Sequence, residues 1–279
     1  MLVFSSLSLR RGSKPLFTDA SFTISPGQKV GITGANGVGK SSLFSLILGE
    51  LAADSGDFTL PAGWTIAHVA QHTPSGNMAA LDYVLQGDRE YIELVRAIQL
   101  ATDNDDGMKQ AELHAQMEDI DGYTAESRAA TLLHGLGFKH SEIREPLEHF
   151  SGGWRMRLNL AQALMCRSDL LQLDEPTNHL DLDAVIWLQT WLQRYSGTLL
   201  LISHDREFLD AFITQIANIE NQGITLYTGN YTAFEQRRAE QLAQQQAAYS
   251  KQQKEIDHIR QFVSRFGAKA TKAKQAQSR

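Results

Sequence analysis

The stretch GANGVGKSS, residues 34–42, constrains the fold of this chain more than any other. It matches the pattern G-x-x-x-x-G-K-S/T, with a β-rich run before it (residues 28–33) and the spacing of an amphipathic helix after it (residues 41–51). A strand, a glycine loop and a helix in this order are typical of a phosphate-binding loop, whose backbone N–H groups turn inward around the anion. The alternative is a chance match in an ordinary glycine turn.

Each residue type in this loop has a predicted use. Lys40 is expected to reach the β- and γ-phosphates of a nucleotide, and Ser41 to coordinate Mg²⁺. The predicted nucleotide-binding residues of the loop are Gly34, Asn36, Gly37, Val38, Gly39, Lys40, Ser41 and Ser42.

A pair of acids follows a second apolar strand. In LLQLDEPTNHLDLDAVIW, residues 170–187, the strand ends at Asp174 and Glu175. In proteins with this loop, an Asp at the end of a neighbouring strand holds Mg²⁺, so we assign that role to Asp174. Glu175 is predicted to orient or deprotonate the attacking water. Alternatively both acids cap the following helix; one acid would be enough for that, so the second favours hydrolysis.

A second glycine turn precedes another helix. FSGGWRMRLNLAQALM, residues 150–165, places Ser151 as a candidate N-cap before Gly152 and Gly153. The helix expected over residues 153–167 leads into the strand that ends at Asp174. A helix N-terminus of this kind is a second potential anion site.

Strand and helix patterns alternate over much of the chain. The expected strands lie at residues 65–71, 169–174, 198–203 and 214–220, and helices at residues 181–195 and 205–213. This alternation predicts an α/β fold with a mostly parallel sheet covered by helices. Three early strands, about residues 2–9, 22–24 and 58–60, predict an antiparallel side sheet.

The middle of the chain is predicted to be helical, with no strand between residues 82 and 136. Two amphipathic segments flank the turn TDNDDG, residues 102–107, and indicate a helical hairpin of about residues 88–121. Another helix follows, with Thr124 as a possible N-cap. The hairpin interrupts the α/β frame, and residues 123–168 form a helical subdomain.

The charge is unevenly distributed along the 279 residues. Residues 235–279 hold 10 Lys and Arg against 4 Asp and Glu, which leaves −12 for the rest of a chain whose net charge is −6. This tail is predicted to be one long helix that meets something negative, and we expect the chain to end within that helix. A solvated helix with surplus lysines is the alternative.

The single cysteine, Cys166, excludes an internal disulfide, and no apolar run approaches the ~20 residues that span a bilayer.

In their order, the phosphate loop, SGGW, LDEPTNHLD and SHD resemble the ATP-binding cassette family. The segments FSGGWRMRLNLAQAL and LDEPTNHLDLDAVIWL resemble the corresponding segments of the ABC-F branch. This branch comprises cytosolic ATPases with two cassettes and no membrane part. The resemblance implies a cassette domain at residues 1–234 with the hairpin as its arm, and the first, truncated part of an interdomain linker helix at residues 235–279. It also implies a cytoplasmic location.

The resemblance assigns further residues. Ser151, Gly152 and Gly153 would contact the γ-phosphate held by a partner cassette, and Asp181 would link the two sites. Gln71 and His204 would join Glu175 in the catalytic set, with Ser41, Gln71 and Asp174 around Mg²⁺.

Two positions depart from the family pattern. No aromatic residue precedes the first turn to stack on adenine, and Arg11 is the candidate for that role. Gln172 stands where an aliphatic residue is usual, so its amide needs a partner or costs roughly 1–3 kcal/mol.

The functional expectation is an ATPase that binds ATP and Mg²⁺ and acts on the ribosome near the tRNA exit site. The arm and the basic linker would contact rRNA and tRNA, and a second cassette would complete the nucleotide sites. Two alternatives stay open: the ATPase subunit of a membrane transporter, and a relative that binds branched DNA. The basic helix and the lack of a spanning segment count against the transporter.

Overall fold

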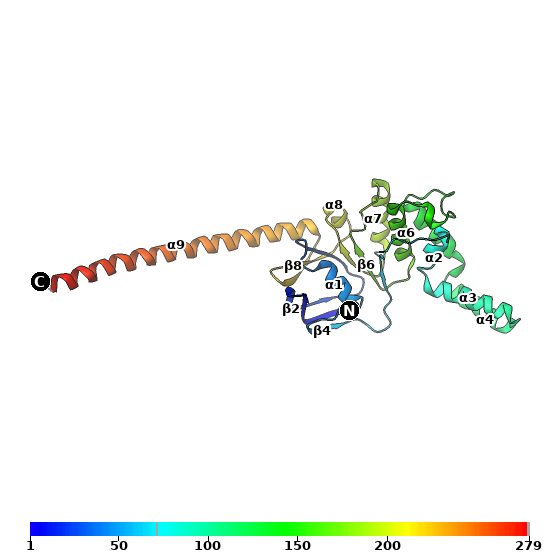
Figure 1. Ribbon diagram of the computed structural model, residues 1–279, viewed down its shortest axis with the longest axis horizontal. Coiled ribbons are helices and arrows are strands. Elements are labelled where there is room, and N and C mark those ends of the chain that lie inside the picture. The colour runs from blue at the N-terminus through cyan, green and yellow to red at the C-terminus, as the bar shows by residue number, and fades with distance from the viewer. Residues whose placement is uncertain (71, 278–279) are drawn as a thin grey trace. The chain divides into compact units, whose positions relative to one another are not determined.

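The computed structural model describes the backbone of residues 1–70 and 72–277, and their side chains up to residue 260 (Figure 1). The chain divides into two compact units, Met1–Tyr231 and Thr232–Arg279.

The main sheet of the first unit has six strands. They are β3 (Lys29–Gly34), β5 (Ile66–His68), β6 (Leu170–Asp174), β7 (Thr198–Ile202), β8 (Gln215–Glu220) and β9 (Gly223–Thr228), in the spatial order β5-β6-β7-β3-β8-β9. All neighbours pair in parallel except β8 and β9. The predicted parallel sheet is therefore confirmed. β9 was not expected, and the strand predicted over residues 65–71 is limited to β5.

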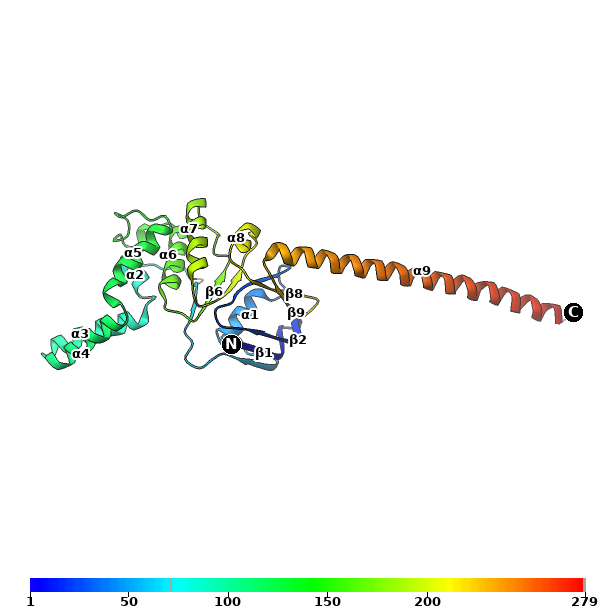
Figure 2. The same ribbon diagram turned by 180° about the vertical axis from the view of Figure 1, so that it is seen from behind.

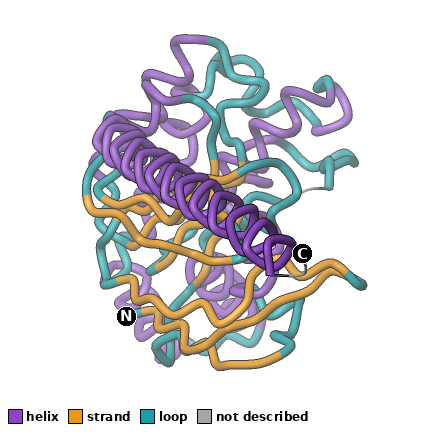
Figure 3. Tube along the Cα trace, turned by 90° about the vertical axis from the view of Figure 1, so that its left-hand side faces the viewer, coloured by secondary structure: helices purple, strands orange, loops and turns teal. Residues whose placement is uncertain are grey.

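The side sheet has the order β2-β1-β4 and is antiparallel throughout, as predicted (strands in orange, Figure 3). Its strands are β1 (Leu2–Arg11), β2 (Lys14–Ile24) and β4 (Ser55–Thr59). β2 begins well before the expected residue 22. Irregular pairing and the positive φ of Ser6 (48°) and Asp19 (54°) break the alternation that marks a strand in sequence.

One apolar core joins both sheets to α1 (Lys40–Ile47). α1 stops short of the expected Leu51, because the chain turns through Gly49 at φ 77°. α8 (Arg206–Asp210) is also shorter than predicted, whereas α7 (Leu182–Arg194) agrees with the expected helix.

The helical part of this unit contains α2 (Ala80–Leu85), which was not predicted, α5 (Ala125–Gly135) and α6 (Gly152–Met165). Turns of 3₁₀ helix cover Gly122–Thr124 and Leu147–His149. Thr124 does not cap α5 with its side chain: its hydroxyl donates to the Asp121 carbonyl instead (2.8 Å). Ser151 occupies the N-cap position of α6 without a side-chain capping bond.

The predicted helical hairpin is formed by α3 (Arg89–Asp103) and α4 (Gly107–Asp119), which we call the arm. Figures 1 and 2 show the two helices side by side, projecting from the end of the unit that carries α2, α5 and α6. A small apolar core holds them together, formed by Leu94, Ala101, Leu113 and Met117. Asp88 and Asp106 cap the two helices through backbone N–H groups.

The described part of the second unit belongs to one helix, α9 (Tyr231–Gln277), whose first residue is the last residue of the first unit. Leu242, Tyr249 and Ile256 recur along it at intervals of seven residues and are exposed. Among the helices described, none combines the length and the apolar character needed to cross a membrane.

Candidate functional site

The loop between β3 and α1 has a backbone that only glycine adopts easily. Gly34, Gly37 and Gly39 have φ values of 145°, 74° and 114°. A Cβ at Gly34 would lie 2.5 Å from the Ile219 carbonyl oxygen, and one at Gly39 would lie 3.0 Å from Leu16 Cβ. The glycines thus let the loop curl tightly ahead of α1, as a phosphate cradle requires.

Two lysines lie against this loop. Lys40 Nζ donates to the carbonyl oxygens of Gly34 (2.8 Å) and Ala35 (3.3 Å). Lys14, from β2, donates from Nζ to the Gly37 carbonyl (3.1 Å). Lys14 was not identified from sequence, because nothing near it in the chain marks it as part of the loop.

Ser41 and Asp174 meet although 133 residues separate them. The Ser41 hydroxyl donates to Asp174 Oδ2 at 2.8 Å. Asp174 ends β6 and the loop follows β3, with β7 between the two strands. The carboxyl ends of parallel strands share one edge of the sheet, where α/β proteins bind ligands.

Glu175 and His204 face each other next to this pair. Glu175 has φ 48° and donates its backbone N–H to the Ile202 carbonyl (2.8 Å). Its Oε1 lies 3.5 Å from His204 Nε2, and its Oε2 accepts the His204 backbone N–H at 3.4 Å. Burial raises the pKa of Glu175, and the neighbouring His204 opposes that rise. A carboxylate with a raised pKa beside a phosphate loop is suited to accept a proton from water.

These groups surround a cavity of about 340 Å³. It is lined by Arg11, Leu16, Asn36, Gly37, Gly39, Lys40, Ser41, Ser42, Asp174, Glu175, Ile202 and His204. The glycine cradle, the lysine and the hydroxyl–carboxylate pair fit a polyphosphate with a divalent cation. In the part of the chain that the structure describes, no group of three or more His, Cys, Asp or Glu could hold a metal by itself.

The remaining predicted residues differ in position. Arg11 lines the cavity, and no Phe, Tyr or Trp is among the residues that line it. Val38 does not line it; its side chain packs against the apolar core beside Gly34. Gln71 lies outside the described residues. Ser151, Gly152 and Gly153 do not line the cavity either, so this chain does not bring its two glycine turns together.

Asp181 belongs to a network centred on Arg157 of α6. Arg157 is 10% exposed and donates to Asp181 Oδ2 (2.9 Å), the His179 carbonyl (2.8 Å) and the Leu136 carbonyl (2.9 Å). Asp181 also caps α7 by accepting the Ala184 N–H (3.0 Å). The hydrogen bond from this N–H is the main cause that lowers the pKa of Asp181, and the hydrogen bond from Arg157 is the second. Sequence reasoning missed Arg157, which fixes Asp181 to α6.

A second residue of α6 was also missed. Asn159 is 1% exposed, and its Nδ2 donates to the carbonyls of Ala70 and His72 at 2.8 Å each. Its Oδ1 accepts a hydrogen bond from the Tyr83 hydroxyl (2.7 Å). Asn159 therefore holds the chain on both sides of position 71.

A larger cavity, about 620 Å³, lies among α5, the end of α6 and the end of α7. It shares no lining residue with the phosphate-loop cavity, and no glycine or lysine is among the residues that line it. Cys166 lines it, and burial raises the pKa of its thiol, which disfavours a reactive thiolate.

Known protein families and known proteins match most of this chain. Two family models, both described as ABC transporter, match residues 17–178 and 217–279. Over the whole chain, 57% of residues are identical to "Probable ATP-binding protein YheS" of Haemophilus influenzae and to the protein of the same name in Escherichia coli K12. The chain spans 44% of the length of each.

More distant relatives also match most of this chain. Human "ATP-binding cassette sub-family F member 3" is 38% identical over 276 residues, which is 96% of this chain and 38% of that protein. A solved ATP-binding subunit of an ABC transporter shares the fold, with a TM-score of 0.61 at 18% identity over 82% of this chain and 90% of that one. The chain therefore belongs to the ATP-binding cassette family, as a cassette of the ABC-F type.

Proposed function

We propose that this chain binds ATP with Mg²⁺ and hydrolyses it, together with a second cassette, to act on the ribosome near the tRNA exit site. The observation that carries the ATPase proposal is the Ser41–Asp174 hydrogen bond, 2.8 Å long, beside Glu175 and His204 in one cavity. The ribosomal part rests on the arm, on the basic helix and on the resemblance to ABC-F proteins.

Within the cavity, Lys40 and the loop N–H groups would bind the phosphates. Ser41 and Asp174 would hold Mg²⁺, which would neutralise phosphate charge. Glu175 would take a proton from the attacking water. The ring and the backbone N–H of His204 contact the Glu175 carboxylate and would hold it in position. Arg11 would lie against the base.

A second cassette is proposed because the turn Ser151–Gly152–Gly153 is outside the cavity of its own chain. Ser151 and Gly152 are exposed, and a Cβ at Gly152 would meet nothing within 4 Å. An accessible helix N-terminus of this kind can bind the phosphate of another cassette's nucleotide.

The proposal for RNA rests on charge and shape. The last 17 residues, VSRFGAKATKAKQAQSR, contain five Lys and Arg and no acid. A segment with this charge binds nucleic-acid phosphates without reading the sequence. The arm adds a two-helix projection with its own small core, suited to reach a large partner.

ATP hydrolysis is tested with purified chain at several concentrations. We expect slow phosphate release, with a rate per molecule that rises with protein concentration as cassettes meet. Glu175→Gln should lower the rate by about a hundredfold or more while ATP still binds. A rate per molecule that is high and independent of concentration in a monomer would refute the need for a second cassette.

The partner is tested with a full-length relative whose cassette is equivalent to this chain, and its residues are given the numbers of this chain. With ATP, its Glu175→Gln variant should co-sediment with ribosomes, and with ADP it should not. A variant that does not co-sediment with ribosomes and instead binds branched DNA tightly would refute the ribosomal proposal and support the DNA-binding alternative. High-salt washes should weaken either complex if phosphates are the contacts.

A further inference from the structure

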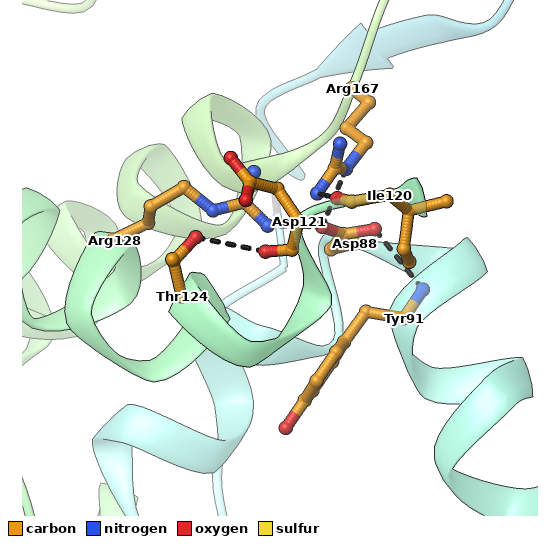
Figure 4. Close-up of polar contacts among 7 residues, drawn as sticks. All are labelled: Asp88, Tyr91, Ile120, Asp121, Thr124, Arg128 and Arg167. Carbon is orange, nitrogen blue, oxygen red and sulfur yellow. Dashed lines mark hydrogen bonds and ion pairs between the residues drawn. The ribbon is translucent and has the colours of Figure 1, made fainter. Parts of the chain in front are cut away.

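Asp88 stands at the base of the arm and is almost fully buried, at 2% exposure. Its carboxylate accepts three hydrogen bonds: from the Tyr91 N–H (3.2 Å), Arg128 Nη2 (2.9 Å) and Arg167 Nε (2.9 Å) (Figure 4). A buried carboxylate persists only when it is well paired, and removing one partner of such a group is strongly destabilising. The two arginines therefore fix this end of α3.

Arg167 holds both ends of the arm. While its Nε bonds Asp88 at the start of α3, its Nη2 donates to the carbonyl of Ile120, which directly follows α4 (Figure 4). One guanidinium thus joins the outgoing and returning chains. Because its planar fork has several fixed donors, neither a lysine nor an amide could make both contacts in the same way.

The segment before the arm is also fastened to α6. A Cβ at Gly87 would lie 2.1 Å from the Gln162 carbonyl oxygen and 3.1 Å from Met165 Cβ, so only glycine allows this close approach. Gln162 Nε2 donates to the Tyr83 carbonyl (3.0 Å), and the Tyr83 hydroxyl donates to Asn159 (2.7 Å). Contacts to this segment therefore run along the second half of α6, from Asn159 to Met165, and continue to Arg167.

The same helix begins at the glycine turn Ser151–Gly152–Gly153 and ends two residues before Arg167. We propose that Asp88 and Arg167 are positioning residues that lock the arm to α6, so that the arm moves with this turn as one rigid body. Neither residue lines the phosphate-loop cavity, so this inference goes beyond the proposed function. Only the consequence for the ribosome rests on that function.

Spin-label distances test the lock without nucleotide. Labels at Met108→Cys, on the exposed start of α4, and Thr131→Cys, on the exposed side of α5, are used with Cys166→Ser. We expect one narrow distance distribution in this parent and a broadened or shifted one in Asp88→Asn and Arg167→Gln. The matched control is Lys109→Gln, which breaks an exposed arm ion pair and should leave the distribution unchanged.

Amide hydrogen exchange gives a second measurement without labels. Exchange in the first turn of α3 should be at least about tenfold faster in Asp88→Asn and Arg167→Gln than in Lys109→Gln, with little change in β6 or β7. Adding Arg167→Gln to Asp88→Asn should have a less than additive effect, because both remove the Asp88–Arg167 contact and each removes further contacts of its own. If Asp88→Asn does not fold, Arg167→Gln decides the outcome.

Unchanged distances and unchanged arm exchange in a folded Arg167→Gln protein would overturn the proposal. In the full-length relative, Arg167→Gln combined with Glu175→Gln should keep the ATP affinity but reduce ribosome co-sedimentation. If the Glu175→Gln variant alone does not co-sediment with ribosomes, the ribosomal proposal is refuted, but the distance measurements still test whether the arm is locked to α6.

Discussion

Replacing Gln172 by leucine is expected to stabilise the first unit. Gln172 lies in the middle of β6, between Leu171 and Leu173, and is 1% exposed. Among the side chains and backbone that the structure describes, neither its amide nitrogen nor its amide oxygen has a hydrogen-bond partner, although both are buried. The folded state therefore carries the desolvation penalty of this amide without compensation.

The size of the effect follows from that penalty. A buried polar group without a partner costs about 1–3 kcal/mol, and leucine has a similar volume and no polar atoms to bury. We expect Gln172→Leu to raise the free energy of unfolding by about 1–3 kcal/mol. For a unit of this size this corresponds to a Tm higher by about 2–12 °C.

Asn159 provides the matched control, because it is equally buried and its amide is fully paired. Asn159→Leu should lower stability by about 1–3 kcal/mol, since it leaves two carbonyls and the Tyr83 hydroxyl without their partner. Both variants are measured by urea unfolding and by calorimetry in the same buffer. The pair separates the effect of hydrogen bonding from that of placing leucine in a core.

A lower Tm for Gln172→Leu would refute the reasoning. The cavity beside Gln172, about 340 Å³, is also lined by Ser45, His68 and His72. Destabilisation by more than 1 kcal/mol would mean that a polar partner binds the amide there in solution.

Three further predictions concern the site. Lys40→Ala should weaken ATP binding by about a hundredfold or more in titration calorimetry, with Lys109→Ala as the control cation; equal affinities would refute the phosphate-loop assignment. The raised pKa of Glu175 means that its contribution to stability is present below the unfolded-state pKa and is lost as pH rises through the folded-state pKa. Thus Glu175→Gln should raise Tm at neutral pH, with a gain that shrinks on acidification, and wild-type hydrolysis should increase as pH rises through the same pKa; a gain in Tm independent of pH would contradict this. Asp181→Ala should cost about 1 kcal/mol through the lost cap of α7, and because the folded-state pKa of Asp181 is lowered, this cost should fade as pH drops through that pKa; a constant cost down to low pH would count against it.

The sequence by itself determined the features whose chemistry is contiguous. The phosphate loop needs glycines at fixed positions ahead of a helix, so GANGVGKSS predicted both a strand–loop–helix unit and its ligand class. Buried parallel strands give continuous apolar runs, which is why β6 and β7 were predicted. Strands whose pairing is irregular, such as β2, were only partly predicted because their alternation is broken.

Only the tertiary structure decided which distant residues meet. Packing along α6 placed Asn159 and Arg157 against backbone carbonyls far away in sequence, and no motif had indicated these contacts. The sequence predicted that Gln172 needs a partner, and only the structure showed that none of the described residues forms a hydrogen bond with its amide. Such pairings depend on the summed packing of the whole core, which no local pattern encodes, whereas loop geometry depends on a few consecutive residues.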